Sequence, residues 1–213
     1  MDTALITQAP DRKLAPKKRR LKHMQQASLV WAAEKWPATE LFQFFTTADG
    51  YLATGHMTGL VNATPFALEY KISLNPHWVI TAAHIRSLTN VQQTIGLHHN
   101  GQGQWEDADG HLLSRLQGCM DVDISLTPFT NTLPIRRLHW QEGVPQVIDV
   151  VYIDVPSFKV EHVRQRYTAL RKGVFLYENM TNDFKAELNV DEHGLVIHYP
   201  GVYARVFAEV VKD

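Results

Sequence analysis

The segment PFALEYKISL, at residues 65–74, decides the fold class of this chain. Apolar side chains occupy every second position from Phe66 to Leu74, and polar residues such as Glu69 and Lys71 stand between them. A period of two is the pattern of a β-strand that buries one face, whereas an amphipathic helix repeats every three to four residues. Asn75-Pro76 then ends the run. The segment is therefore predicted to be a half-buried strand.

The same pattern returns near the end of the chain, on both sides of a turn. Apolar and polar residues alternate over 184–190, a turn follows at 191–194, and Leu195, Ile197 and Tyr199 continue the alternation. Two alternating runs joined by a short turn indicate an antiparallel hairpin.

Turn signals recur at short spacing along the body of the chain. They are Ala48-Asp49-Gly50, Asn75-Pro76, Asn100-Gly101, Ala108-Asp109-Gly110, Arg171-Lys172-Gly173 and His193-Gly194. The segment VIDVVYIDV, at 147–155, is rich in β-branched residues and almost continuously apolar, as expected of a strand covered on both faces. Helical turns are expected only at 27–36 and within 123–138. We predict a mostly-β fold of about a dozen short strands.

Residues 123–138, DISLTPFTNTLPIRRL, combine short hydrogen-bonding side chains, two prolines and an arginine pair. We predict that a strand ends before Thr127-Pro128, which caps a short helical turn. Pro134 is expected to stop this turn before 135–138 re-enter the sheet. The Thr and Asn side chains would then satisfy backbone groups where the helix and the strands meet. Contact with a ligand is the alternative use of the same side chains.

Charge divides the chain into a basic N-terminal segment and a mildly acidic body. Up to His23 there are seven Lys or Arg against two Asp, whereas the remaining chain has 14 Lys or Arg against 20 Asp or Glu. We expect residues 1–24 to form a flexible tail and 25–213 to form one domain, since no further break in composition follows. The acidic body argues against a nucleic-acid platform, and the basic run is expected to be a solvated extension.

Cysteine usage and hydropathy together predict a soluble cytoplasmic protein. Cys119 is the one cysteine, so no disulfide can form within the chain and a disulfide-stapled secreted fold is excluded. The basic run is not followed by the apolar region of a secretory signal. No stretch approaches the roughly 18 apolar residues of a membrane span, so stable membrane insertion is not expected.

Motifs for catalysis and for metal binding are weak. Cys119 lies in a strand-like apolar context without a neighbouring cation, which favours a buried structural thiol. Asp121 and Asp123 share one face of a strand, and such a carboxylate pair could serve glycoside hydrolysis. The acidic turns at 107–110 and 189–194 lack the ligand pattern of an EF-hand, and the histidines lack zinc-site spacing. Since no phosphate-binding loop occurs either, neither a metal nor a cofactor is expected.

Arginines in the body of the chain are candidates for binding an anion. They are Arg136, Arg137, Arg164 and Arg166. A guanidinium group forms bidentate contacts with phosphate or with carboxylate. Internal pairing with Asp121, Asp123 or Asp154 is the favoured interpretation, and contact with an anionic ligand is the alternative.

Three long segments of the sequence resemble a known bacterial family. They are GCMDVDISLTPFTNTLPIRRL (118–138), VVYIDVPSFKVEHVRQRYTAL (150–170) and FKAELNVDEHGLVIHYPGVYARV (184–206). WEDADGHLL at 105–113 and the strand at 65–74 are similar as well. The family is that of the putative glycolipid-binding proteins, and the resemblance covers residues 28–207, nearly the whole body.

The resemblance implies a spiral β-roll, in which a long antiparallel sheet of many short strands wraps around a single short helix. It also implies a role in holding a glycolipid, and it brings no catalytic residues with it. We therefore expect a non-enzymatic protein that binds an amphipathic ligand in an apolar groove with polar head-group contacts. The expected contacts are Asp123, Thr127, Phe129, Thr130, Asn131, Arg136, Arg137, Tyr152 and Arg166.

Two alternatives remain open at this point. A hydrolase or lyase acting on a sugar conjugate would use Asp121 and Asp123, and it requires a deep pocket with carboxylates about 5–10 Å apart. A structural protein, for example a homodimer, would use the polar cluster only to pin the fold.

Overall fold

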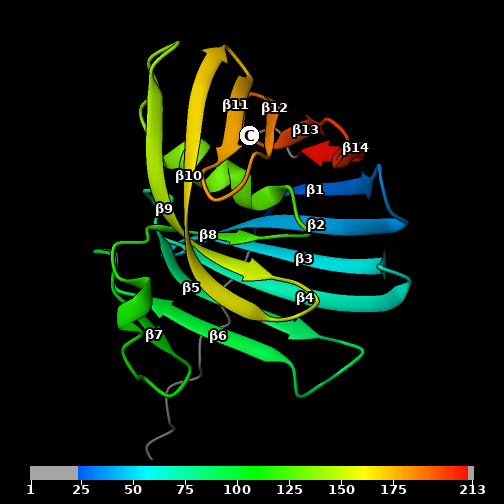
Figure 1. Cartoon of the computed structure of the whole chain (residues 1–213), viewed down its shortest axis with the longest axis vertical. Coiled ribbons are helices and arrows are strands. Elements are labelled where there is room, and N and C mark those ends of the chain that lie inside the picture. Colours follow the sequence, from blue (N-terminus) through cyan, green and yellow to red (C-terminus); the bar gives the residue numbers. More distant parts are fainter. Residues whose placement is uncertain (1–23, 211–213) are drawn as a thin grey trace, which may run out of the picture.

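A computed structural model of the chain describes residues 24–210, which form one 14-stranded sheet with a short helical segment (Figure 1). The strands of the first half are β1 Met24–Ala33, β2 Ala38–Thr47, β3 Gly50–Val61, β4 Thr64–Leu74, β5 Ile80–Ser87, β6 Thr94–His99 and β7 Trp105–Asp107. Those of the second half are β8 Asp121–Ile124, β9 Pro145–Asp154, β10 Lys159–Arg171, β11 Val174–Asn179, β12 Lys185–Val190, β13 Val196–Tyr199 and β14 Tyr203–Val210. The predicted basic tail lies outside the described residues, apart from Met24.

The sheet is a long antiparallel meander whose two arms meet at β1 and β14. In space the strand order is β7-β6-β5-β4-β3-β2-β1-β14-β13-β12-β11-β10-β9-β8. The chain passes from β7 at one edge to β8 at the other through η1 (Ser114–Leu116), and β8 joins β9 in parallel. The sheet curls without closing. The predicted spiral β-roll is confirmed.

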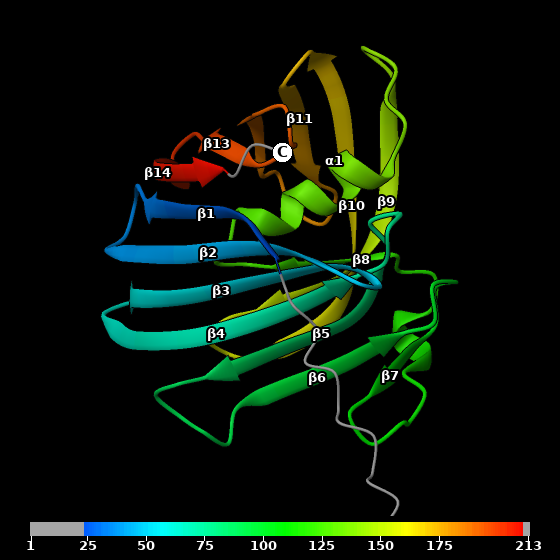
Figure 2. The ribbon, with the colours of Figure 1, turned by 180° about the vertical axis from the view of Figure 1, so that it is seen from behind.

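The helical segment lies within the curl, between the two arms of the sheet (Figures 1 and 2). It consists of η2 (Phe129–Asn131) and α1 (Thr132–Arg137). Phe129 is fully buried and its ring centroid lies 4.5 Å from that of Phe42 on β2. From the other arm, the hydroxyl of Tyr167 on β10 donates a 2.9 Å hydrogen bond to Asn131 Oδ1. The helical segment therefore joins both arms in one core.

Several predicted strands are confirmed. Residues 65–74 fall in β4, whose burial alternates, and the predicted hairpin is β12 and β13. In β9 the adjacent Val150 and Val151 are both buried, so the middle of this strand is covered on both faces. Val147 near its beginning is exposed, which limits that cover to the central part.

The expectation of helical turns at 27–36 is wrong, because most of this segment is strand β1. Ala27, Leu29 and Trp31 are buried at a period of two. β1 pairs with β2 on one side and with β14 on the other, and this pairing decides the conformation of a short apolar run.

The joint at 127–138 also differs in part from expectation. Thr127-Pro128 begins the helical turn as predicted: Pro128 is its N-cap residue, and Thr127 Oγ1 accepts a 3.1 Å hydrogen bond from the backbone N–H of Phe129. Pro134 does not stop the turn, and 135–138 do not re-enter the sheet. As the third residue of α1, Pro134 stands in the first turn, where the backbone N–H groups need no intrahelical partner. The helix therefore continues to Arg137.

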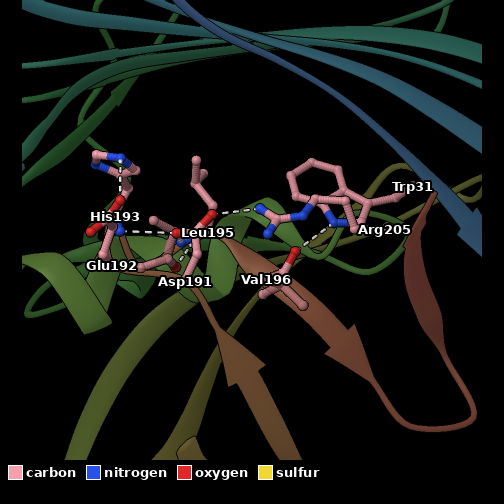
Figure 3. A network of polar contacts seen from close by, with 9 residues as sticks. Trp31, Asp191, Glu192, His193, Leu195, Val196 and Arg205 are labelled. Carbon is pink, nitrogen blue, oxygen red and sulfur yellow. Dashed lines mark hydrogen bonds and ion pairs between the residues drawn. The ribbon is translucent and has the colours of Figure 1, made fainter. Parts of the chain in front are cut away.

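A polar network fixes the turn between β12 and β13 onto the strands where the two arms meet (Figure 3). Asp191 Oδ1 accepts hydrogen bonds from the backbone N–H groups of His193 and Leu195. Asp191 Oδ2 accepts from Arg205 of β14, and the indole N–H of Trp31 donates a 2.8 Å bond to a backbone carbonyl of β13. The bond from Trp31 ties β1 of the first arm to β13 of the second.

Within residues 24–210, no helix is long and apolar enough to cross a membrane.

Candidate functional site

A pocket of about 270 Å³ lies between the end of β8 and three turns of the sheet. Six aromatic residues line it: Trp36, Tyr152, Tyr177, Phe184, Tyr199 and Tyr203. Its polar lining comes from Lys35, Asp123, Ser125, Thr127, Asn131, Asn179 and Asn182. The turns between β1 and β2, between β11 and β12, and between β13 and β14 all contribute residues.

Three of these rings form what we call the aromatic corner: Tyr177, Phe184 and Tyr199. Their ring centroids are 6.0 to 6.3 Å apart in each pair, and their planes are inclined to one another by 52° to 70°. Tyr177 belongs to β11, Tyr199 ends β13, and Phe184 follows the turn after β11. Asn182 Oδ1 accepts from the backbone N–H of Phe184, which helps to hold this ring at the pocket. Rings inclined in this way at this spacing pack against one another, and all three line the pocket.

Asp123 brings a carboxylate to the pocket from β8. Its Oδ1 accepts a 3.1 Å hydrogen bond from Thr130 Oγ1, and its Oδ2 accepts a 2.5 Å bond from Gln165 Nε2. Burial raises the pKa of Asp123, and the two hydrogen bonds oppose this rise. Burial raises the pKa values of Tyr177 and Tyr199 as well, and the nearby Asp123 charge adds to both increases. Asp123 therefore presents a carboxylate in the same pocket as these tyrosines.

A second buried carboxylate, that of Glu40, lies behind the pocket. Its Oε1 accepts a 2.5 Å hydrogen bond from the hydroxyl of Tyr70 and a 2.9 Å bond from Thr127, which lines the pocket. Glu40 Oε2 has no hydrogen-bond partner among the residues that the structure describes. Burial raises the pKa of Glu40 to about 8, against the effect of its two hydrogen bonds. Sequence reasoning missed this residue.

Four of the nine predicted contacts line the pocket together. They are Asp123, Thr127, Asn131 and Tyr152. Thr130 lies next to them and supports the Asp123 carboxylate. Phe129 belongs to the core, where it is fully buried against Phe42 and Tyr70.

The predicted arginine contacts lie outside the pocket lining. Arg136 stacks over the Trp78 ring, with its guanidinium carbon 4.8 Å from the ring centroid. Arg137 forms two hydrogen bonds with Asp121, and Arg166 forms two with Glu178. Internal pairing was the favoured interpretation of these arginines, and it is confirmed for Arg137, which binds one of the expected carboxylates.

The carboxylate pair of the hydrolase alternative is not assembled in the pocket. Asp121 is fully buried and its side chain is bound by Arg137. Among the described residues that line the pocket, only Asp123 has a carboxylate side chain. Cys119 is buried, as predicted, and burial raises the pKa of its thiol to about 12, so it is not poised as a nucleophile.

Elsewhere in residues 24–210, one cluster could supply ligands for a cation. Asp107, Asp109 and His111 hold their ligand atoms close together in the turn after β7. Asp107 Oδ1, however, accepts from the backbone N–H groups of Asp109 and His111. These bonds explain the cluster as an ordinary turn.

Comparison with known proteins identifies the family. A family model described as "Putative glycolipid-binding" matches residues 28–205, well over half of the chain. The chain belongs to this family. The crystal structure of a DUF1089 family protein from Pseudomonas aeruginosa is similar, with a TM-score of 0.69 and 32% sequence identity over 96% of this chain and 100% of that one. No curated protein matches.

The match to the glycolipid-binding family covers the whole pocket. The residues that line it run from Lys35 to Tyr203, and all of them fall within the matched range. The basic segment before residue 24 falls outside the match. The resemblance noted in the sequence is thus confirmed.

Proposed function

We propose that the protein binds the sugar head group of a glycolipid, or of a similar amphipathic ligand, in this pocket without catalysing a reaction. The observation that supports this most is the combination of the aromatic corner with the polar groups of Asp123 and Asn131 in one pocket. A sugar ring has an apolar face of C–H groups and an edge of hydroxyls. Aromatic rings pack against the C–H face, and carboxylate and amide groups form hydrogen bonds with the hydroxyls.

The size of the pocket favours a head group over a whole lipid. Its volume of about 270 Å³ is at the lower end of small-molecule sites, which span roughly 300–1,000 Å³. Phe184 lines the pocket yet is 40% exposed, and Met180, beside the pocket-lining Asn179, is 43% exposed. In the proposed complex the sugar occupies the pocket, and an acyl chain leaves along these exposed apolar side chains.

The proposed polar contacts differ from the arginine contacts expected from sequence. Arg137 and Arg166 are each paired with a carboxylate of the protein itself. In the proposal, the contacts to hydroxyl groups come instead from four residues that line the pocket: Asp123, Asn131, Asn179 and Asn182. Since they present both donors and acceptors, they match the hydroxyl groups of a sugar.

Replacing Phe184 with alanine tests the proposal with little risk to the fold. We expect Phe184→Ala to weaken binding of n-octyl β-D-glucopyranoside, used below its micelle concentration, about tenfold, roughly 1.4 kcal/mol. Isothermal titration calorimetry on the full chain measures the change.

Phe207→Ala is the matched control, because Phe207 is also an exposed phenylalanine, on β14 and outside the pocket lining. Its affinity for the glucoside should equal that of the wild type, and its stability should change little. Equal losses in the two variants, or no binding of this probe or of related alkyl glycosides by the wild type, would count against the proposal.

A further inference from the structure

The Asp123 carboxylate stands in the pocket without a positively charged partner. Its hydrogen-bond donors, Thr130 and Gln165, are both neutral. None of the salt bridges within residues 24–210 includes it. Asp121, two residues earlier on the same strand, is by contrast bound by Arg137. A carboxylate removed from bulk water without a counter-ion is costly for the fold and attracts a cation strongly.

The aromatic corner shares the pocket with this carboxylate. Tyr177, Phe184 and Tyr199 lie 6.0 to 6.3 Å apart with planes inclined by 52° to 70°. Aromatic rings carry negative charge on their faces, and several rings around one place form the cages that bind ammonium groups. Asp123 lines the same pocket as all three of these rings.

We propose that the head group bound in this pocket carries a positively charged amine, held against the aromatic corner with Asp123 as its counter-ion. This inference rests on the proposed function and names the chemical class of its ligand. An amino sugar of a glycolipid and an alkylammonium head group of the ethanolamine or choline type share this chemistry. A neutral sugar would leave the Asp123 charge unpaired.

Lys35 is the cation that lines the pocket, and its position is compatible with a second cation inside. It is an exposed residue in the turn after β1. The neighbouring Glu34 has a lowered pKa, chiefly through its hydrogen bond to His198, with a small contribution from the charge of Lys35. A solvated charge at the rim is screened by water and salt, so its repulsion of an amine at Asp123 is weak.

The experiment compares matched glycosides on the full chain by calorimetry at pH 6.5. The probes are methyl β-D-glucosaminide, methyl N-acetyl-β-D-glucosaminide, methyl β-D-glucoside, choline and ethanolamine. We expect the glucosaminide, which carries the charged amine, to bind at least tenfold more tightly than both neutral glycosides. In Asp123→Asn this preference should fall below threefold. Asp109→Asn, which changes an exposed turn carboxylate outside the pocket, should keep the full preference.

The outcomes separate this inference from the proposed function. Equal binding of charged and neutral glycosides by the wild type overturns the amine inference and leaves sugar binding in place. A preference that persists in Asp123→Asn overturns the role of that carboxylate. Tighter binding of choline or ethanolamine than of the glucosaminide supports the amine and identifies a lipid ammonium group as its source. Binding of none of the probes, alkyl glycosides included, counts against both proposals. The wild-type comparison decides the main point even where Asp123→Asn fails to fold.

Discussion

Replacing Arg137 with alanine should lower the free energy of unfolding by about 3–5 kcal/mol, because it leaves a fully buried carboxylate without its partner. Arg137 Nε and Nη2 bind the two oxygens of Asp121 at 3.1 and 2.5 Å. Asp121 is 0% exposed, so its charge is shielded from bulk water in the folded protein. The pair also ties the last turn of α1 to β8, next to the pocket. Urea unfolding at pH 7, followed by circular dichroism, measures the loss.

Arg166→Ala is the matched control for this prediction. Arg166 also forms two hydrogen bonds with a carboxylate, that of Glu178, but its side chain is 40% exposed. An exposed pair contributes about 0–1 kcal/mol, so this variant should lose at most that amount. The double variant Asp121→Asn with Arg137→Ala should recover part of the loss, since no buried charge remains. A similar cost for Arg137→Ala and Arg166→Ala would contradict the role given to the buried pair.

The wild-type protein should lose stability as pH rises from about 5 to 8, and Glu40 should be a main cause. Glu40 is fully buried, and its pKa is about 8 in the folded protein against an ordinary value of 4.5. Between these values the folded state holds a proton that the unfolded state has released. The stability term of Glu40 is therefore present below pH 4.5 and is lost towards pH 8, by up to about 1.4 kcal/mol for each pH unit.

Glu40→Gln removes this titration while keeping an oxygen that accepts from Tyr70 and Thr127. We expect the variant to be more stable than the wild type at pH 8 and to show a flatter stability profile, as measured by urea unfolding at several pH values. Glu187→Gln, at an exposed position of β12, should leave the wild-type slope unchanged. Parallel profiles for the wild type and Glu40→Gln would show that Glu40 is ionised in the folded protein across this range.

Much of the sheet could be predicted from sequence because its strands alternate cleanly. The run from Phe66 to Leu74 buries every second side chain, as the pattern requires. The prediction of helical turns at 27–36 was wrong because a short apolar run is compatible with both helix and strand. Only its pairing with β2 and β14 decides between the two. The prediction that Pro134 stops the helix was wrong because the effect of a proline depends on whether it lies in the first turn of the helix or later.

The pocket could be predicted only in part, because its walls come from distant turns. The polar segment 123–138 pointed to Asp123, Thr127 and Asn131, which do line the pocket. Tyr199 was placed on a strand face, but sequence does not show whether such a face meets the core or a pocket. Phe184 reaches the site through the turn after β11, which only the fold brings there.

Glu40 carried a signal that sequence reasoning did not use. It shares the period of Ala38, Phe42 and Phe44, which are all buried on the same face of β2. A carboxylate in such a row must be buried or must break the strand pattern.

Native mass spectrometry of the protein, purified gently from its native host, tests ligand binding most directly. We predict a bound species whose mass and fragmentation identify a sugar-bearing lipid, retained in Phe207→Ala and strongly reduced in Phe184→Ala. Bare protein in every preparation, together with no binding to a panel of glycolipids, would contradict a role in holding a glycolipid.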